Sequence, residues 1–142
     1  MTRRLKAAAA AAALALVLAP GAATAERVRV TGEIIDSWCY LTEIMYPLGS
    51  AHHQCATWCA AGGIPVGIVD DAGQVYIVLR MGAGGGNVAD PAILEIQSHR
   101  VTVEADLIER DGAKYLLIDS VVDDQGVVNL THEDYGIQPF GE

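Results

Sequence analysis

Two segments with alternating apolar side chains flank a short turn signal, and this pair constrains the fold more than any other feature of the chain. The segments are RVTVEADLIE, residues 100–109, and AKYLLIDSVV, residues 113–122, with RDG around the turn between them. In the first, Val101, Val103 and Ala105 fall on one face, the period of two that is typical of a strand with one buried side. The pair therefore predicts a β-hairpin.

Three further strands are expected earlier in the chain. The stretch RVRVTGEIID, residues 27–36, alternates polar with apolar residues, as a half-buried strand does. The short β-branched runs IPVGIV, residues 64–69, and QVYIVL, residues 74–79, flank the letters DDAG. This pattern predicts a second hairpin, with Gly73 at the turn position that requires a positive φ.

Two helices interrupt the strands. Ser50 is a good N-cap for a helix over residues 51–61, which Gly62 and its glycine neighbour would end. Asp90, followed by a proline, predicts a second helix through about Ser98. The order β, helix, β, β, helix, β, β is that of a mainly β, OB-like five-stranded barrel. The first helix, which bears cysteines, would be inserted between strands one and two, and a β-sandwich is the main competing architecture.

The chain after residue 25 shows no repeat and no linker. Residues 26–122 are expected to form the OB-like domain, and residues 123–142, polar and aromatic without clear periodicity, a C-terminal arm that wraps or docks. The letters GAGGGN, residues 82–87, lack the Lys-Ser/Thr end of a phosphate-binding loop and follow no βαβ unit, so a flexible loop is expected there.

The first 25 residues have the composition of an export signal. A basic start is followed by about a dozen apolar residues and by PGAATA, whose small-x-small end signal peptidase recognises. Cleavage after Ala25 would send residues 26–142 to the periplasm or the exterior with no transmembrane segment, because the apolar run is shorter than the ~20 residues that a spanning helix needs. The exported part keeps six basic and 18 acidic residues, a formal charge of −12, which argues against nucleic acid as a partner.

A histidine and two cysteines share one stripe of the first predicted helix. With about 100° of turn per residue from His52 as zero, Cys55 lies near 300° and Cys59 near 340°. His53 points about 100° away and is set aside. Trp58 flanks the same stripe and is expected to shield it from water.

The third cysteine, Cys39, follows the first predicted strand and could approach that stripe from another element. Cys39, His52, Cys55 and Cys59 would then form a Cys3His site, which suits copper or zinc better than magnesium or calcium. An exported chain meets oxidising conditions, so Cys39 bonded to Cys55 or Cys59, with one spare thiol, is the alternative. Spacing alone leaves both open.

These residues also carry a resemblance. GEIIDSWC and then HHQCATWCAAGGIPV resemble a family of small exported bacterial proteins with the pattern G-x-x-x-D-x-x-C, H-x-x-C-x-x-x-C, Gly and Pro. In this chain the pattern falls on Gly32, Asp36, Cys39, His52, Cys55, Cys59, Gly63 and Pro65. The resemblance implies an OB-like fold and one linked set of positions, in which Asp36 is an acceptor for the His52 ring. It implies no particular reaction.

The favoured hypothesis is an exported, non-enzymatic domain that holds copper or zinc, for metal handling, for electron transfer or as an accessory subunit of a periplasmic redox complex. The alternative is a disulfide-stapled interaction module without cofactor that docks on a larger periplasmic assembly. A thiol–disulfide exchange enzyme is less favoured, because the two cysteines lie in mid-helix, where the helix dipole lowers a thiol pKa less.

Overall fold

The computed structural model describes residues 25–82 and 90–138. Residues 1–24 of the predicted signal peptide and most of the glycine-rich loop at residues 82–87 lie outside these residues. The strands and helices, in chain order, are β1 (Glu26–Asp36), α1 (Ser37–Thr42), α2 (His53–Ala61), β2 (Val66–Asp70), β3 (Val75–Met81), α3 (Pro91–Leu94), β4 (Arg100–Arg110), β5 (Ala113–Asp124) and α4 (His132–Tyr135). Every predicted strand agrees with an observed one to within two residues at each end.

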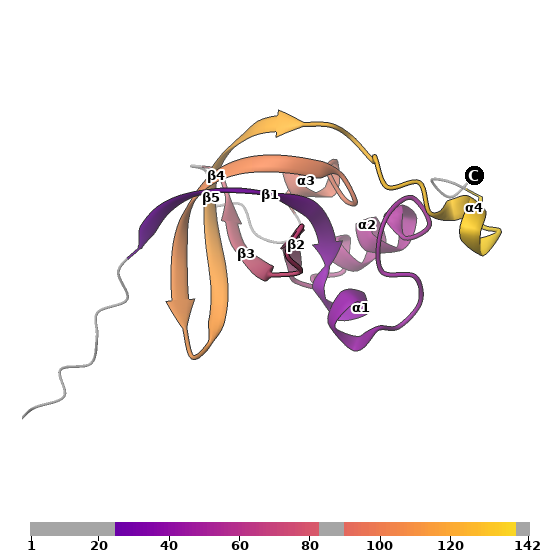
Figure 1. Ribbon diagram of the computed structural model, residues 1–142, viewed down its shortest axis with the longest axis horizontal. Helices are drawn as coiled ribbons and strands as arrows, with labels where there is room; N and C mark the ends of the chain where they lie inside the picture. The colour runs from indigo at the N-terminus through magenta and orange to yellow at the C-terminus, as the bar shows by residue number, and fades with distance from the viewer. Residues whose placement is uncertain (1–24, 83–89, 139–142) are drawn as a thin grey trace, which may run out of the picture.

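The five strands close into a barrel in the order β1-β2-β3-β5-β4. All neighbours are antiparallel except β3 and β5, which run parallel. This confirms the OB-like five-stranded barrel predicted from the sequence, with a helix-bearing segment between β1 and β2 and a short helix between β3 and β4 (Figure 1).

The hairpin of β4 and β5 forms the longest ladder of the barrel. Its turn is Asp111–Gly112, between the paired Arg110 and Ala113, and both turn residues have positive φ, 53° and 82°. Two such angles define the type I′ turn, whose twist matches that of the flanking strands. Val101, Val103 and Ala105 are buried on the inner face of β4, as predicted, in an apolar core that all five strands supply.

Strand β1 is shared between two partners and changes from one to the other at Gly32. Residues 26–33 pair with β4, and residues 32–36 pair with β2. A Cβ at Gly32 would collide with the backbone carbonyl oxygen of Val69. Glycine is required here because the two backbones approach each other closely, and the pairing directs the end of β1 toward the helices.

The helical segments differ from the prediction at three places. Residues 37–42 form α1, a helix that the sequence analysis did not predict. Helix α2 begins at His53 rather than at residue 51, and its N-cap is His52, so Ser50 as N-cap was wrong. Helix α3 has the predicted cap, since the Asp90 side chain accepts a hydrogen bond from Ala92 N at 2.9 Å, but its α-helical part ends at Leu94.

The C-terminal arm docks on the chain just before α2. Asn129 O accepts a hydrogen bond from Ser50 N at 2.8 Å, and Thr131 Oγ1 donates to Leu48 O at 2.9 Å. Ser50 Oγ accepts from His132 N at 3.1 Å and lies 2.7 Å from His132 Nδ1. The Ser50 hydroxyl group therefore binds the first backbone N–H of α4 in the arm instead of capping α2. Among the described residues, no helix combines the length and the apolar character that membrane crossing demands.

Candidate metal centre

Five potential ligands lie where the end of β1 faces α2. We call residues 37–65, which contain α1 and α2, the cysteine lobe. Asp36 ends β1 and caps α1, because its Oδ1 accepts hydrogen bonds from Trp38 N at 2.8 Å and Cys39 N at 3.3 Å. The cap turns the chain so that Cys39 points inward. Asp36 is 1 % exposed and Cys39 4 % exposed.

The other three ligands come from α2 and its first residue. His52 has helical backbone angles, φ −100° and ψ −13°, so it continues the spiral of α2 toward its N-terminus. This is why the predicted stripe of His52, Cys55 and Cys59 persists although the helix starts later than expected. His52 is 1 % exposed, whereas Cys55 and Cys59 are partly exposed.

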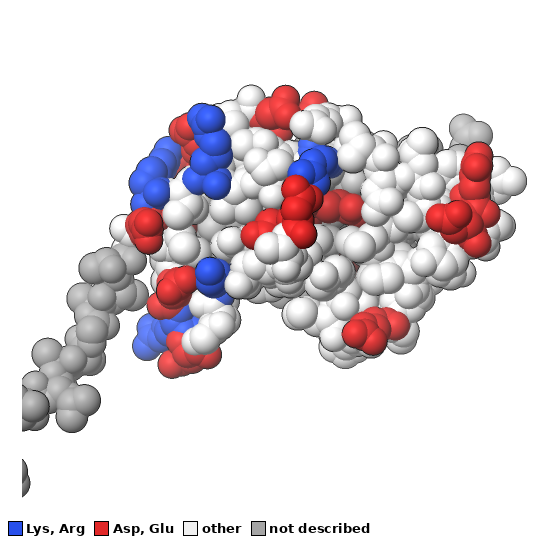
Figure 2. All heavy atoms as spheres, in the orientation of Figure 1, with Lys and Arg blue, Asp and Glu red and all other residues white. Residues whose placement is uncertain are grey.

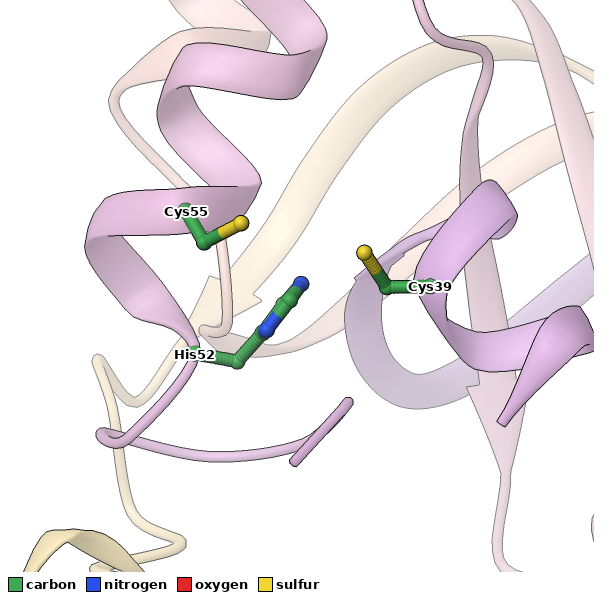
Figure 3. A group of neighbouring side chains, drawn as sticks. All are labelled: Cys39, His52 and Cys55. Carbon is green, nitrogen blue, oxygen red and sulfur yellow. The ribbon is translucent and has the colours of Figure 1, made fainter. Parts of the chain in front are cut away.

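The structure brings Cys39 to this stripe. The ligand atoms of Cys39, His52 and Cys55 all lie within 4.8 Å of one another, and so do those of Asp36, Cys39 and Cys59. Figure 3 shows the far end of the His52 ring, which carries Nε2, between the sulfurs of Cys39 and Cys55. The groups share Cys39 and could hold a metal ion.

All three cysteines are free thiols in this structure. The Sγ atoms of Cys55 and Cys59 are 3.9 Å apart. A disulfide would need about 2.05 Å. Two thiolates on one tetrahedral zinc, each at ~2.3 Å, lie roughly 3.8 Å apart. The observed separation therefore suits joint coordination of an ion without movement of the helix.

Two buried side chains of the centre have unsatisfied polar atoms. Among the described residues, neither ring nitrogen of His52 has a hydrogen-bond partner, nor does Asp36 Oδ2. The closest approach between them, Nε2 to Oδ2, is 3.7 Å, too long for a hydrogen bond. Each unsatisfied buried group costs about 1–3 kcal/mol, so the protein alone leaves this arrangement unfavourable.

The electrostatics of the centre favour neutral thiols and a charged Asp36. Burial and the neighbouring Asp36 raise the pKa of the Cys39 thiol to about 12, and the same causes raise the pKa of Cys59. Burial alone would raise the pKa of Asp36, but the Cys59 and Cys39 thiols and two backbone N–H groups lower it overall. Burial also lowers the pKa of His52, against the opposing effect of Asp36. A bound cation would reverse this balance, because it deprotonates the thiols that coordinate it.

The surroundings of the centre favour a cation. Every Lys and Arg after residue 25 lies on a barrel strand: Arg27, Arg29, Arg80, Arg100, Arg110 and Lys114. In Figure 2 the blue side chains lie over the barrel, whereas the surface over α1, α2 and α4 shows only acidic charge. No basic side chain of the cysteine lobe competes with an incoming cation for its ligands.

Of the two residues predicted to lie next to the site, one lies as expected and the other does not. His53 is off the stripe, as expected, with its Nδ1 2.8 Å from Gln97 O. Trp58 was expected to cover the cysteines, but its side chain is 69 % exposed, so most of the ring faces solvent. It precedes Cys59 on the helix and turns outward because successive helical residues lie about 100° apart.

The α1 cap of Asp36 is the feature that the sequence interpretation missed. An N-cap signal was present, since Asp36 is directly followed by SWCYLT without glycine or proline.

Comparison of the chain with family models, curated proteins and solved structures found no significant match. The resemblance to a family of small exported proteins stays a prediction.

Proposed function

We propose that this chain is an exported domain that binds a transition metal, copper or zinc, through Cys39, His52, Cys55 and Cys59. The observation that carries the proposal is the buried His52 ring, which has no hydrogen-bond partner in the described residues and whose far end faces two sulfurs. A buried imidazole in a purely structural role normally has such a partner. A metal ion would satisfy Nε2 and would bring the thiols together as ligands.

The proposed roles are metal handling, electron transfer or service as an accessory subunit of a periplasmic redox complex. The export signal expected in residues 1–25 supports a location in the periplasm or outside the cell. The acidic side chains near α1 and α4, together with the lack of Lys and Arg in residues 37–65, support cation capture. A binding role is favoured over catalysis, because burial and Asp36 raise the pKa of the Cys39 thiol beside His52 to about 12, so this thiol is a poor nucleophile.

Metal content of paired histidine variants tests the proposal. The purified full chain would be loaded with Zn²⁺ or, under anaerobic conditions, with Cu⁺, and its metal content measured by elemental analysis and native mass spectrometry. His52→Ala should lose the metal, and so should Cys39→Ser. His53→Ala is the matched control, because it removes the adjacent imidazole, which lies off the stripe; it should bind as the wild type does.

One outcome would favour the alternative instead. A metal-free protein lighter by the mass of two hydrogen atoms, with Cys39 bonded to Cys55 or Cys59 in freshly purified material, would indicate a disulfide-stapled interaction module. Equal metal content in His52→Ala and His53→Ala would remove His52 from the ligands.

A further inference from the structure

The two carboxylate oxygens of Asp36 have different environments. Oδ1 is held by the backbone N–H groups of Trp38 and Cys39 at the start of α1. Oδ2 is buried and has no hydrogen-bond partner among the described residues. The cap of α1 thus uses one oxygen and leaves the other directed into the centre.

The free oxygen lies on the ligand side of His52. It is 3.7 Å from Nε2, the nitrogen at the end of the ring that faces the sulfurs. A carboxylate that only orients a metal-binding histidine accepts from the ring nitrogen that does not bind the metal. Two ligand atoms each about 2 Å from one zinc ion are roughly 3.3 Å apart, so a small shift would place both on the same ion.

We infer that Asp36 Oδ2 is itself a metal ligand, beside Cys39 and Cys59, and that the centre takes a divalent ion of the zinc type rather than Cu⁺. This inference rests on the proposed function. A carboxylate oxygen is a usual ligand of Zn²⁺, whereas Cu⁺ prefers soft sulfur ligands. The ligand atoms of Asp36, Cys39 and Cys59 already lie within 4.8 Å of one another.

Charge supports the same ion. The thiolates of Cys39 and Cys59 and the carboxylate of Asp36 would place three negative charges at the ion, and residues 37–65 contain no Lys or Arg to offset them. A divalent ion compensates twice the charge that a monovalent ion does. Because zinc has no redox chemistry, the inference also removes electron transfer from the proposed roles and keeps metal handling and service as an accessory subunit.

Asp36→Asn separates the ligand role from the cap. Asparagine is as good an N-cap as aspartate, so α1 should remain while the negative oxygen is lost. Asp90→Asn is the matched control, because Asp90 caps α3 through the same kind of hydrogen bond and belongs to neither ligand group. Far-UV circular dichroism and thermal unfolding of both metal-free variants would verify that the fold is kept.

The affinities of the full-length protein for Zn²⁺ and, anaerobically, for Cu⁺ would be measured by competition with chromophoric chelators. Asp36→Asn should lower Zn²⁺ affinity by about 10–100-fold, the range known for disturbed metal-site partners, and should change Cu⁺ affinity by less than about threefold. Asp90→Asn should change neither. An equal loss for both ions, or an unchanged Zn²⁺ affinity, overturns the inference.

Cobalt gives a direct view of the ligands. The ligand-field bands of the Co²⁺-loaded protein should shift in Asp36→Asn and stay in place in Asp90→Asn. Unshifted bands in Asp36→Asn would remove Asp36 from the ligands while leaving the four-ligand site intact. A wild-type protein that binds neither Zn²⁺ nor Cu⁺ would instead contradict the proposed function itself.

Discussion

The barrel and the cysteine lobe have opposite distributions of apolar and polar groups. The barrel interior is apolar and its charged side chains form exposed pairs, such as Arg29 with Glu104 at 2.7 Å. In the lobe the buried side chains include Asp36 at its border, His52 and Cys39, and large apolar side chains such as Trp38 and Leu41 are exposed. Apolar burial stabilises the barrel, whereas the lobe and its border bury polar atoms of His52 and Asp36 that have no hydrogen-bond partner in the described residues.

The apolar core makes this difference concrete. Of the buried residues in the described core cluster, only Ala60 belongs to the cysteine lobe; the others come from the five strands and from α3 with the turn after it. Burial of apolar area is the main favourable term in folding, so most of the free energy of unfolding resides in the barrel. The candidate metal ligands, in contrast, lie in the cysteine lobe and at its border, where apolar burial contributes least to the free energy of unfolding.

The largest expected effect is on the barrel core. Leu116 on β5 is fully buried, whereas Leu79 on β3 is half exposed. Leu116→Ala should lower the free energy of unfolding by about 2–5 kcal/mol through lost burial and a cavity. Leu79→Ala, the matched change at the surface, should cost about 0.5 kcal/mol or less. Urea unfolding of both variants measures this, and equal costs would contradict a barrel core that carries the stability.

Metal loading should affect the cysteine lobe almost exclusively. Zn²⁺ at about 100 times its Kd should stabilise the lobe against local opening by about 2.7 kcal/mol, because it binds only the closed lobe. Backbone hydrogen exchange should slow in residues 37–65 and change little in β4. Cys39→Ser, which removes the ligand common to both groups, should abolish the effect. Uniform protection of barrel and lobe would show that the two are not separate in stability.

The arm should loosen when its contact with the lobe is removed. Ser50 is 2 % exposed and Ser120 on β5 is exposed, so their alanine variants form a matched pair. Ser50→Ala removes the bonds to His132 and should cost about 1 kcal/mol, with faster hydrogen exchange in residues 129–136. Ser120→Ala should leave exchange there unchanged. Slow exchange in both variants would mean that the backbone bonds of the arm hold it without Ser50.

The smallest expected effect is a pH dependence of stability that arises from Glu33, at the junction of barrel and arm. Burial raises the pKa of Glu33 above its ordinary 4.5, although hydrogen bonds from Gly49 N and Asn129 Nδ2 oppose the shift. The folded state then keeps a proton that the unfolded chain loses first. Stability from this group is full below about pH 4.5 and is lost as the pH rises through the folded pKa.

Glu33→Gln removes that titration. Its stability relative to the wild type should therefore increase as the pH rises from about 4 to 7, as measured by thermal unfolding across that range. A constant difference between Glu33→Gln and wild type would contradict the raised pKa.

The strands could be predicted because their signal is local. Alternation with a period of two, the RDG turn and Gly73, whose φ is 78°, are read from a few neighbouring residues, and each agrees with the structure. The helix ends were less accurate. Ser50 has the right side chain for an N-cap, but its hydroxyl group instead accepts a hydrogen bond from the backbone N–H of His132, which is distant in the sequence.

The site was predicted in part. The stripe of His52, Cys55 and Cys59 followed from helical geometry, because these residues lie within eight positions of one another. The position of Cys39 could not be derived in this way, since it depends on how β1 ends and how α1 turns. The burial of Asp36 and the direction of its Oδ2 depend on the same packing.

The sequence by itself determined where the strands lie along the chain and the helical stripe of His52, Cys55 and Cys59, because both follow from periods repeated along the chain. Only the tertiary structure decided that Asp36 and Cys39 face that stripe. Gly32 lets β1 pass from β4 to β2, and the cap at Asp36 then turns Cys39 toward α2. This placement of Asp36 and Cys39 beside α2 depends on barrel closure and on contacts between residues that are distant in the sequence. No local pattern of side chains encodes such contacts.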